Sequence, residues 1–171
     1  MFRWFKELFT LVGWLFTSRP SDSRLDGLEV VQMRHFPFIG YKYMMWCGRI
    51  ITRKDKAAVE KEFTDTEAGR RSMTHETIHC VQAIAEHDDN WLRYYWMYFA
   101  HWLKRNPLTH PASACYYCNR YEVEAYANED DPDYWVVYSR DNLKYKYDIK
   151  GAKKMFRKLG KKGWKDYIKT L

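Results

Sequence analysis

The chain has 171 residues, of which 46% are hydrophobic and 18% aromatic. This length fits one domain with a sizeable core, and the apolar share excludes a globally disordered protein. The net charge of +7 is uneven, because residues 144–171 carry a local charge of +9 and residues 1–143 a charge of −2.

The first segment, residues 1–17, is predicted to form an amphipathic helix. Between residues 2 and 16, apolar side chains recur at steps of three and four, the spacing of one helix face. The apolar run is shorter than the about 20 residues that span a bilayer, and no suitable signal-peptidase site follows it. Its apolar face therefore packs on the protein or on another subunit, or lies on a membrane surface. Residues 18–27 are polar and form a connector.

The next segment, residues 28–143, is expected to be the main domain and to begin with a small sheet. The strand candidates are Leu28–Arg34, Tyr41–Trp46 and Arg49–Thr52, which are rich in β-branched, aromatic and other apolar residues. We expect them to form an antiparallel sheet of two to three strands.

Helices are expected in the rest of this domain. The patterns predict a short helix at Asp55–Phe63, a long one from about Thr66 to Glu86, and two more at Trp91–Lys104 and Ala114–Asn128. Because Trp91–Lys104 is apolar almost all round, it is expected to be the central helix, covered by the others. The predicted fold class is therefore α+β, mainly helical.

The last segment, residues 144–171, is basic and predicted to be helical. Two helices, Ala152–Leu159 and Trp164–Leu171, are separated by glycines at 160 and 163. The lysines either keep a surface helix solvated or attract an anionic partner, such as nucleic acid, anionic lipid or an acidic protein.

Four cysteines are present, and two of them form the pattern Cys115-Tyr-Tyr-Cys118. A single CxxC is a weak zinc signal. The cysteines are interpreted as reduced thiols in a packed environment, with a local disulfide or a bound metal as the alternatives.

The stretch Met73–Gln82, MTHETIHCVQ, contains the pattern HExxH. On a helix, His75 and His79 lie about 40° apart around the axis, so that both imidazoles can bind one metal ion. Glu76 lies one position further round, where its carboxylate can reach a water bound to that metal. This is the arrangement of zinc hydrolases, with two ligands and a general base. The alternative is two histidines and a glutamate on an ordinary, partly exposed helix.

Zinc needs a third protein ligand, and for catalysis also an open fourth position. Glu122 and Tyr126 share one face of the helix Ala114–Asn128, and the small Ala125 beside them allows a second helix to approach closely. Glu124 points about 200° away from Glu122, so that only one of these two glutamates can be a ligand.

The HExxH pattern followed by Glu122-Val-Glu-Ala125 resembles the gluzincin metallopeptidases, and its spacing is similar to the glutamate helix of HtpX-like peptidases and ImmA/IrrE-type proteins. Over roughly residues 28–135, the chain most resembles a small group of bacterial and phage zincin-like proteins of the Bacteroides lineage. The resemblance implies a minimal zincin-like domain, in which the sheet packs on the HExxH helix and the glutamate helix. It also implies Zn²⁺ as the cofactor, with His75, His79 and Glu122 as ligands, Glu76 as the general base and Glu124 as the alternative third ligand.

Tyr126 departs from those families, which tend to carry Asp or Asn there to support a ligand histidine. It is interpreted either as a packed aromatic residue or as a hydrogen-bond donor to an oxyanion. His110 is a further candidate for the oxyanion donor. Tyr41–Trp46 is expected to be the strand that pairs with an extended peptide substrate.

The predicted function is that of a zinc-dependent metallopeptidase, in which Glu76 activates a zinc-bound water that attacks a peptide or protein substrate. The alternative is a non-catalytic zinc-binding protein, for example a component of a phage virion or of a membrane-associated assembly. The expected location is the cytoplasm or the periphery of the inner membrane, or the virion for a phage protein. Residues 2–16 are the candidate contact to a membrane or protein partner, and residues 144–171 the candidate contact to an anionic partner.

Overall fold

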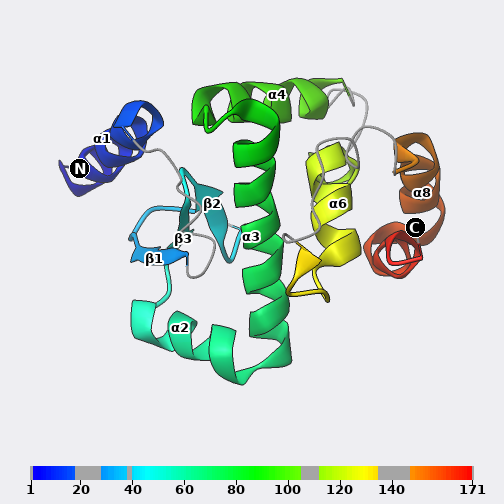
Figure 1. Cartoon of the computed structure of the whole chain (residues 1–171), viewed down its shortest axis with the longest axis horizontal. Helices are drawn as coiled ribbons and strands as arrows, with labels where there is room; N and C mark the ends of the chain where they lie inside the picture. The colour runs from blue at the N-terminus through cyan, green and yellow to red at the C-terminus, as the bar shows by residue number, and fades with distance from the viewer. Residues whose placement is uncertain (1, 18–27, 38–39, 105–111, 135–146, 171) are drawn as a thin grey trace.

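A computed structural model describes residues 2–17, 28–37, 40–104, 112–134 and 147–170. It confirms a mainly helical α+β fold with a small sheet. The long helix α3 (Glu67–His87) runs through the middle of the molecule (Figure 1). The sheet and α2 (Lys56–Asp65) lie on one side of it, α6 (Arg120–Asn128) and α8 (Ile149–Ile168) lie on the other, and α4 (Trp91–Leu103) crosses its C-terminal end. The predicted connector, residues 18–27, falls outside the described residues.

The sheet has three described strands, β1 (Glu29–Gln32), β2 (Met44–Trp46) and β3 (Arg49–Thr52), in the order β1-β3-β2. β3 pairs antiparallel with β2, as predicted, but parallel with β1, so that the sheet is mixed. Ile50 and Ile51 are both fully buried, although successive side chains of a strand point to opposite faces. This strand, apolar on both faces, takes the central position and leaves β2 at an edge.

Capping side chains form the corner between α2 and α3. Asp55 accepts a hydrogen bond from the amide of Ala58 at 3.0 Å, and Thr66 Oγ1 accepts one from the amide of Gly69 at 2.9 Å. The two helices approach so closely that a Cβ on Gly69 would lie 1.8 Å from the carbonyl oxygen of Glu62. The corner therefore fixes where α3 begins, and α3 then continues over the whole predicted HExxH helix.

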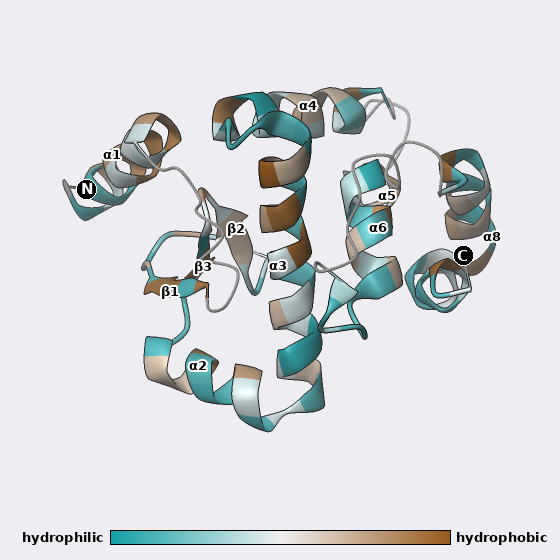
Figure 2. Cartoon of the chain, in the orientation of Figure 1, coloured by the Kyte–Doolittle hydropathy of each residue, from teal (hydrophilic) through white to brown (hydrophobic). Residues whose placement is uncertain are grey.

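α4 is not the central helix that its apolar composition predicts. Only Trp91 and Tyr94 are buried in it, whereas the side chain of Trp96 is 69% exposed. The central position belongs to α3, whose half next to α4 is the apolar part of that helix (Figure 2). The prediction failed because α3 also buries polar residues, such as His79 and Gln82, whose side chains bond to each other, so that burial does not follow apolarity alone.

The helix predicted at Ala114–Asn128 is divided into α5 (Ala112–Tyr117) and α6. The break lies at Asn119, whose backbone is extended and whose side-chain oxygen caps α6 by accepting from the amide of Tyr121. The side-chain amide of Asn119 also donates to the carbonyl oxygen of Tyr98 at 3.1 Å. Asn119 therefore both starts α6 and anchors it to α4.

The basic end of the chain forms α8, with a kink at Gly160, whose φ is 67°. Ala152, Trp164 and Ile168 are fully buried and pack with Tyr117 of α5 and with residues of α6. The basic end is therefore a docked part of the fold and not only a solvated surface helix.

α1 (Phe2–Thr17) confirms the predicted N-terminal helix. One edge packs on the sheet, where Leu11 is buried and its carbonyl oxygen accepts from Trp46 Nε1 at 2.9 Å. Phe9 and Phe16, in contrast, are 72% and 74% exposed. Among the helices that the structure describes, none combines the length and apolar character needed to cross a membrane.

Candidate metal centre

α3 places His75 and His79 side by side, as their spacing predicts. Both side chains are buried, and their ring centroids lie 4.8 Å apart. The side-chain carbonyl of Gln82 lies 2.8 Å from Nδ1 of His79. A hydrogen bond from Nδ1–H to this oxygen leaves Nε2 of His79 as the unprotonated nitrogen, which is the form of imidazole that binds a metal.

α6 brings Glu122 to both imidazoles. Its Oε1 lies 3.3 Å from Nε2 of His79, and its Oε2 lies 3.5 Å from Nε2 of His75. The ligand atoms of the three residues all lie within 4.8 Å of one another. In a tetrahedral zinc site with ligands at about 2.0–2.1 Å from the ion, the ligand atoms lie about 3.4 Å apart, so that the residues present fit zinc.

The Oε2 atom of Glu122 supports the same conclusion. It is buried and has no hydrogen-bond partner within the described part of the chain. The other oxygen, Oε1, accepts from the hydroxyl of Tyr98 at 2.7 Å, and the hydroxyl of Tyr116 also bonds to this carboxylate. Two tyrosines from α4 and α5 therefore hold the carboxylate, while both of its oxygen atoms lie beside the histidines, as is expected for a group that binds a cation.

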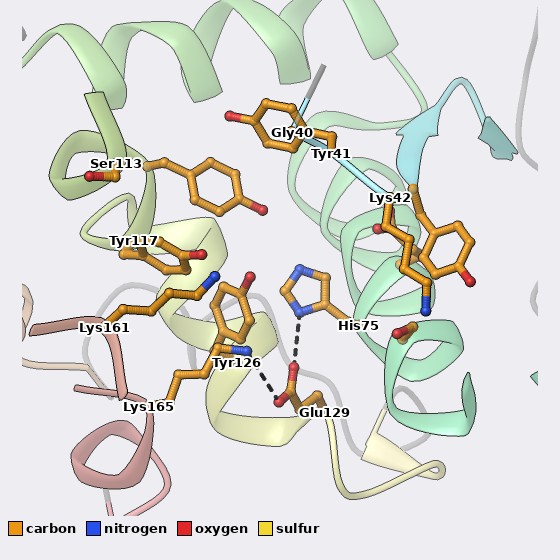
Figure 3. Close-up of a pocket in the computed structure, with 14 residues that line it drawn as sticks. Gly40, Tyr41, Lys42, His75, Ser113, Tyr117, Tyr126, Glu129, Lys161 and Lys165 are labelled. Carbon is orange, nitrogen blue, oxygen red and sulfur yellow. Dashed lines mark ion pairs between the residues drawn. The ribbon is translucent and has the colours of Figure 1, made fainter. Parts of the chain in front are cut away.

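His75 is oriented by a carboxylate that the sequence reasoning missed. Oε2 of Glu129, which follows α6, lies 3.5 Å from Nδ1 of His75 (Figure 3). The other oxygen of Glu129 lies 3.9 Å from Nζ of Lys165 and 3.8 Å from Nζ of Lys169, both on α8. Glu129 comes seven residues after Glu122, two helical turns along the same face, and this spacing is the signal that would have found it.

Tyr126 does not take the position on His75 that the resemblance assigns to Asp or Asn, because Glu129 takes it. The ring of Tyr126 packs on the imidazole of His75, with the centroids 4.5 Å apart. Burial raises the pKa of Tyr126 above its usual range, so that its hydroxyl stays a neutral donor. Tyr126 is therefore a packed aromatic residue that also lines the space next to His75.

The carboxylates around the histidines favour positive charge at the centre. Burial opposes a charge on His75, but Glu122 and Glu129 outweigh it and raise the pKa of His75 to about 10. Burial likewise opposes a charge on Glu122, yet His79 and His75 bring the pKa of Glu122 below its usual range. The centre therefore holds an anionic ligand set that a proton or a metal cation neutralises.

Glu76 lies beside the three candidate ligands and is not one of them. It is buried, and burial raises its pKa, while His75 and His79 act in the opposite direction. A hydrogen bond with the backbone of Met45 ties Glu76 to β2. A buried carboxylate with a raised pKa next to candidate metal ligands is suited to accept a proton.

Two cavities meet at Glu76. The first, of about 440 Å³, contains His75, Glu129 and three lysines in its wall and is called here the basic cavity (Figure 3). The second, of about 340 Å³, contains His79, Glu122 and the apolar and aromatic side chains of β2 and α4, and is called the apolar cavity. The candidate metal ligands are therefore accessible from open space on two sides.

The remaining candidates lie elsewhere. Glu124 accepts hydrogen bonds from Gln82 and from the hydroxyl of Tyr134, both at 2.8 Å, and of the two glutamates the structure brings Glu122 to the histidines. Burial raises the pKa of Glu124 to about 7. His110 falls outside the described residues. All four cysteines are described, none forms a disulfide, and none joins the three candidate ligands.

Comparisons of the chain with models of known protein families, with curated proteins and with solved structures find no match. The resemblance to the gluzincins therefore stays a prediction.

Proposed function

We propose that the protein is a zinc-dependent metallopeptidase of the gluzincin type. The observation that carries this proposal is the buried group of His75, His79 and Glu122, with Glu76 beside it where the two cavities meet. Catalytic zinc sites have three protein ligands and keep a fourth position open, whereas structural sites are normally closed by four protein ligands. The three ligands and the adjoining space favour a catalytic site.

In this proposal Glu76 is the general base. Its carboxylate takes the proton of the water that attacks the peptide carbonyl and passes it to the leaving amine. Zinc held by His75, His79 and Glu122 would polarise the carbonyl and lower the pKa of water. Tyr126 lines the basic cavity, and burial raises the pKa of its hydroxyl, so that it is the candidate donor to the developing negative charge.

The substrate is proposed to be a peptide or protein that pairs with β2. β2 is an edge strand, and Met44, Met45 and Trp46 line the apolar cavity. An edge strand accepts an added strand through its outward backbone groups, but the carbonyl oxygen of Met45 already accepts from the hydroxyl of Tyr95 at 3.1 Å and the backbone of Met45 is bonded to Glu76. Pairing would therefore use the preceding residues of the predicted segment Tyr41–Trp46. A segment bound in this way would pass Glu76, which is tied to β2 through Met45.

One observation favours a second function. The candidate ligands belong to α3 and α6, so that a bound metal would also fasten these two helices together. A non-catalytic zinc protein, such as an assembly component of a virion or of a membrane complex, would need the same ligands. For either function we expect a location in the cytoplasm, at the inner membrane or, for a phage protein, in the virion. The exposed aromatics of α1 and the lysines of α8 are the proposed contacts to partners.

Zinc content and peptide hydrolysis, measured on the wild type and on Glu76→Gln, test the proposal. We expect about one zinc per chain in both proteins and hydrolysis by the wild type alone, because an amide cannot take up the proton. Full zinc content with no cleavage of any peptide by the wild type would leave the non-catalytic function. Absence of stoichiometric metal would contradict both.

A further inference from the structure

The basic cavity has a property that metal binding does not require. Lys42, Lys161 and Lys165 line it together with several tyrosines. Lys161 and Lys165 extend into it from α8, Lys42 lies on the opposite side, and His75 lies between them (Figure 3). A cavity lined by positively charged side chains next to a proposed catalytic centre indicates the kind of group that the substrate carries.

Two of the three lysines already have carboxylate partners. Lys42 forms an ion pair with Glu62. Nζ of Lys165 lies 3.9 Å from Glu129 and 4.0 Å from the ring centroid of Tyr126. The positive charges of Lys42 and Lys165 are therefore already paired with carboxylates of the protein.

Lys161 is different. Its Nζ lies 5.0 Å from the ring centroid of Tyr117, and no carboxylate of the described residues lies within 4.0 Å of it. The face of an aromatic ring attracts a cation, so that Tyr117 favours this position of the ammonium group beside the cavity. Three residues later, Trp164 is fully buried and anchors this part of α8. The ammonium group of Lys161 is therefore held beside an aromatic ring and has no carboxylate partner among the described residues.

The carboxylates in the wall of the basic cavity do not supply that anion. Glu129 faces His75, Lys165 and Lys169. Glu76 is buried next to the histidines. An anion in the cavity could pair with the ammonium group of Lys161 without displacing a carboxylate of the described residues, and the cavity is large enough for a side chain or a chain end.

We propose that the basic cavity is a subsite for a carboxylate of the substrate and that Lys161 selects it. The inference rests on the proposed peptidase function and names its substrate class. The carboxylate belongs either to an Asp or Glu side chain near the scissile bond or to the C-terminus of a peptide. The apolar cavity, on the other side of Glu76, takes an apolar or aromatic residue of the same substrate. Lys161 determines specificity and does not take part in the chemical step.

Fluorogenic decapeptides with a central Phe test the subsite. Glu, Gln or Lys flanks the Phe on either side, and each peptide is made with a free and with an amidated C-terminus. We expect zinc-loaded wild type to cleave the Glu peptides with a kcat/KM about fivefold above the Gln peptides, the effect of a partly shielded ion pair. If the C-terminal carboxylate occupies the subsite, amidation produces the same loss and the flanking residue has no effect.

Charge reversal identifies the residue responsible. Lys161→Glu is expected to invert the preference, so that Lys peptides are cleaved faster than Glu peptides. Lys162→Glu makes the same change at the next position, which is exposed and outside the cavity wall, and is expected to keep the preference of the wild type.

Binding of the same peptides to zinc-loaded Glu76→Gln, followed by fluorescence anisotropy, tests the subsite without hydrolysis. A preference for the carboxylate that disappears when Lys161→Glu is added supports the subsite. Equal affinity for all peptides, or a preference that survives Lys161→Glu, overturns it. A lack of cleavage by the wild type together with the binding preference overturns the peptidase function and leaves the subsite standing.

Discussion

Glu122 and Glu124 show how differently two neighbouring glutamates can behave. They lie two positions apart on α6, so that their side chains point to opposite sides, and both are buried. His79 and His75 keep Glu122 ionised, although burial opposes this. At Glu124 burial dominates and raises the pKa to about 7. Of the two, Glu122 has the charge state that a metal ligand needs.

Replacing each glutamate by glutamine is expected to separate their roles. Glu122→Gln removes a charged ligand, so that zinc content should fall from about one per chain to near zero. Glu124→Gln preserves the shape of the side chain that contacts Gln82 and Tyr134, and it is expected to keep its zinc. Metal analysis of the purified variants measures this, with circular dichroism as the control for folding. Zinc loss in the Glu124 variant alone would contradict the assignment.

Glu129 is expected to tune zinc affinity without binding the ion. Glu129→Gln removes the charge of the carboxylate that lies 3.5 Å from Nδ1 of His75, and loss of such an outer partner typically reduces metal affinity about 10- to 100-fold. Asp133→Asn, an exposed neighbour outside the centre, is the matched control and should bind zinc like the wild type. Competition with a fluorescent chelator gives both dissociation constants. Equal affinity for the two variants would show that Glu129 does not orient His75.

The sequence identifies the residues of the centre that helix spacing alone brings together. His75, Glu76 and His79 follow from one local pattern, and Glu122 follows from a second. Tyr98 and Tyr116 could not be predicted, because their roles depend on how α4 and α5 pack beside α6. Gln82 could have been predicted, because it lies three residues after His79 on the same helix. Glu129 could also have been predicted from the sequence, since it lies on the same helix face as Glu122, two turns later.

Among the elements, α2 is joined to the segment before β2 by the packing of Phe63 on Tyr43 and by the carboxylate of Glu62. Glu62 of α2 pairs with Lys42 and Lys54 and accepts from the hydroxyl of Tyr43 at 3.0 Å. Lys42 and Lys54 lower the pKa of Glu62 to about 2, although burial acts in the opposite direction. Because the folded pKa lies below the ordinary value of 4.5, Glu62 stabilises the fold above that pH, and this contribution is lost as the pH falls through about 2.

Glu62→Gln is therefore expected to reduce the free energy of unfolding by about 1 kcal/mol at neutral pH, a modest amount because solvent screens the half-exposed lysines. The difference from the wild type should shrink between pH 4.5 and pH 2. Urea unfolding at several pH values measures it. Glu60→Gln, which affects an exposed pair with Lys56, is the control and should change stability little. A deficit that stays constant with pH would rule out this account.

Element boundaries could be predicted largely because their signals are local. Asp55 and Thr66 cap helices, and Gly160 kinks α8. The order of the strands in the sheet and the exposure of α4 could not be predicted from the sequence, because both depend on contacts between distant segments. The long run of apolar residues in α4 predicts burial, but the run does not show that α3 would occupy the centre.

In the molecule as a whole, α8 closes one side of the candidate centre. Trp164 is fully buried, and its ring centroid lies 5.4 Å from that of Tyr117 and 5.6 Å from that of Tyr126. Tyr126 in turn packs on His75. The basic end and the centre are thus joined by aromatic packing as well as by the ion pairs of Glu129.

Trp164→Ala is expected to destabilise the protein by about 3–5 kcal/mol, the usual cost of emptying such a site. It should also weaken zinc binding, because Glu129 loses the lysines that hold it beside His75. Leu159→Ala, at a partly exposed position of the same helix, should change both quantities little. Thermal unfolding and chelator competition measure the two effects. Loss of stability with unchanged zinc affinity would mean that α8 does not support the centre.

Glu129 contacts both His75 and the lysines of α8. Binding of a metal at the centre and docking of α8 are therefore expected to be thermodynamically coupled. If docking of α8 increases the free energy of metal binding by a given amount, bound metal must stabilise the docking of α8 by the same amount, since thermodynamic coupling is reciprocal. Removing metal with a chelator should therefore speed hydrogen exchange of the α8 amides, in a segment that contributes no candidate ligand. The last described helix of the chain would then report whether the centre is loaded.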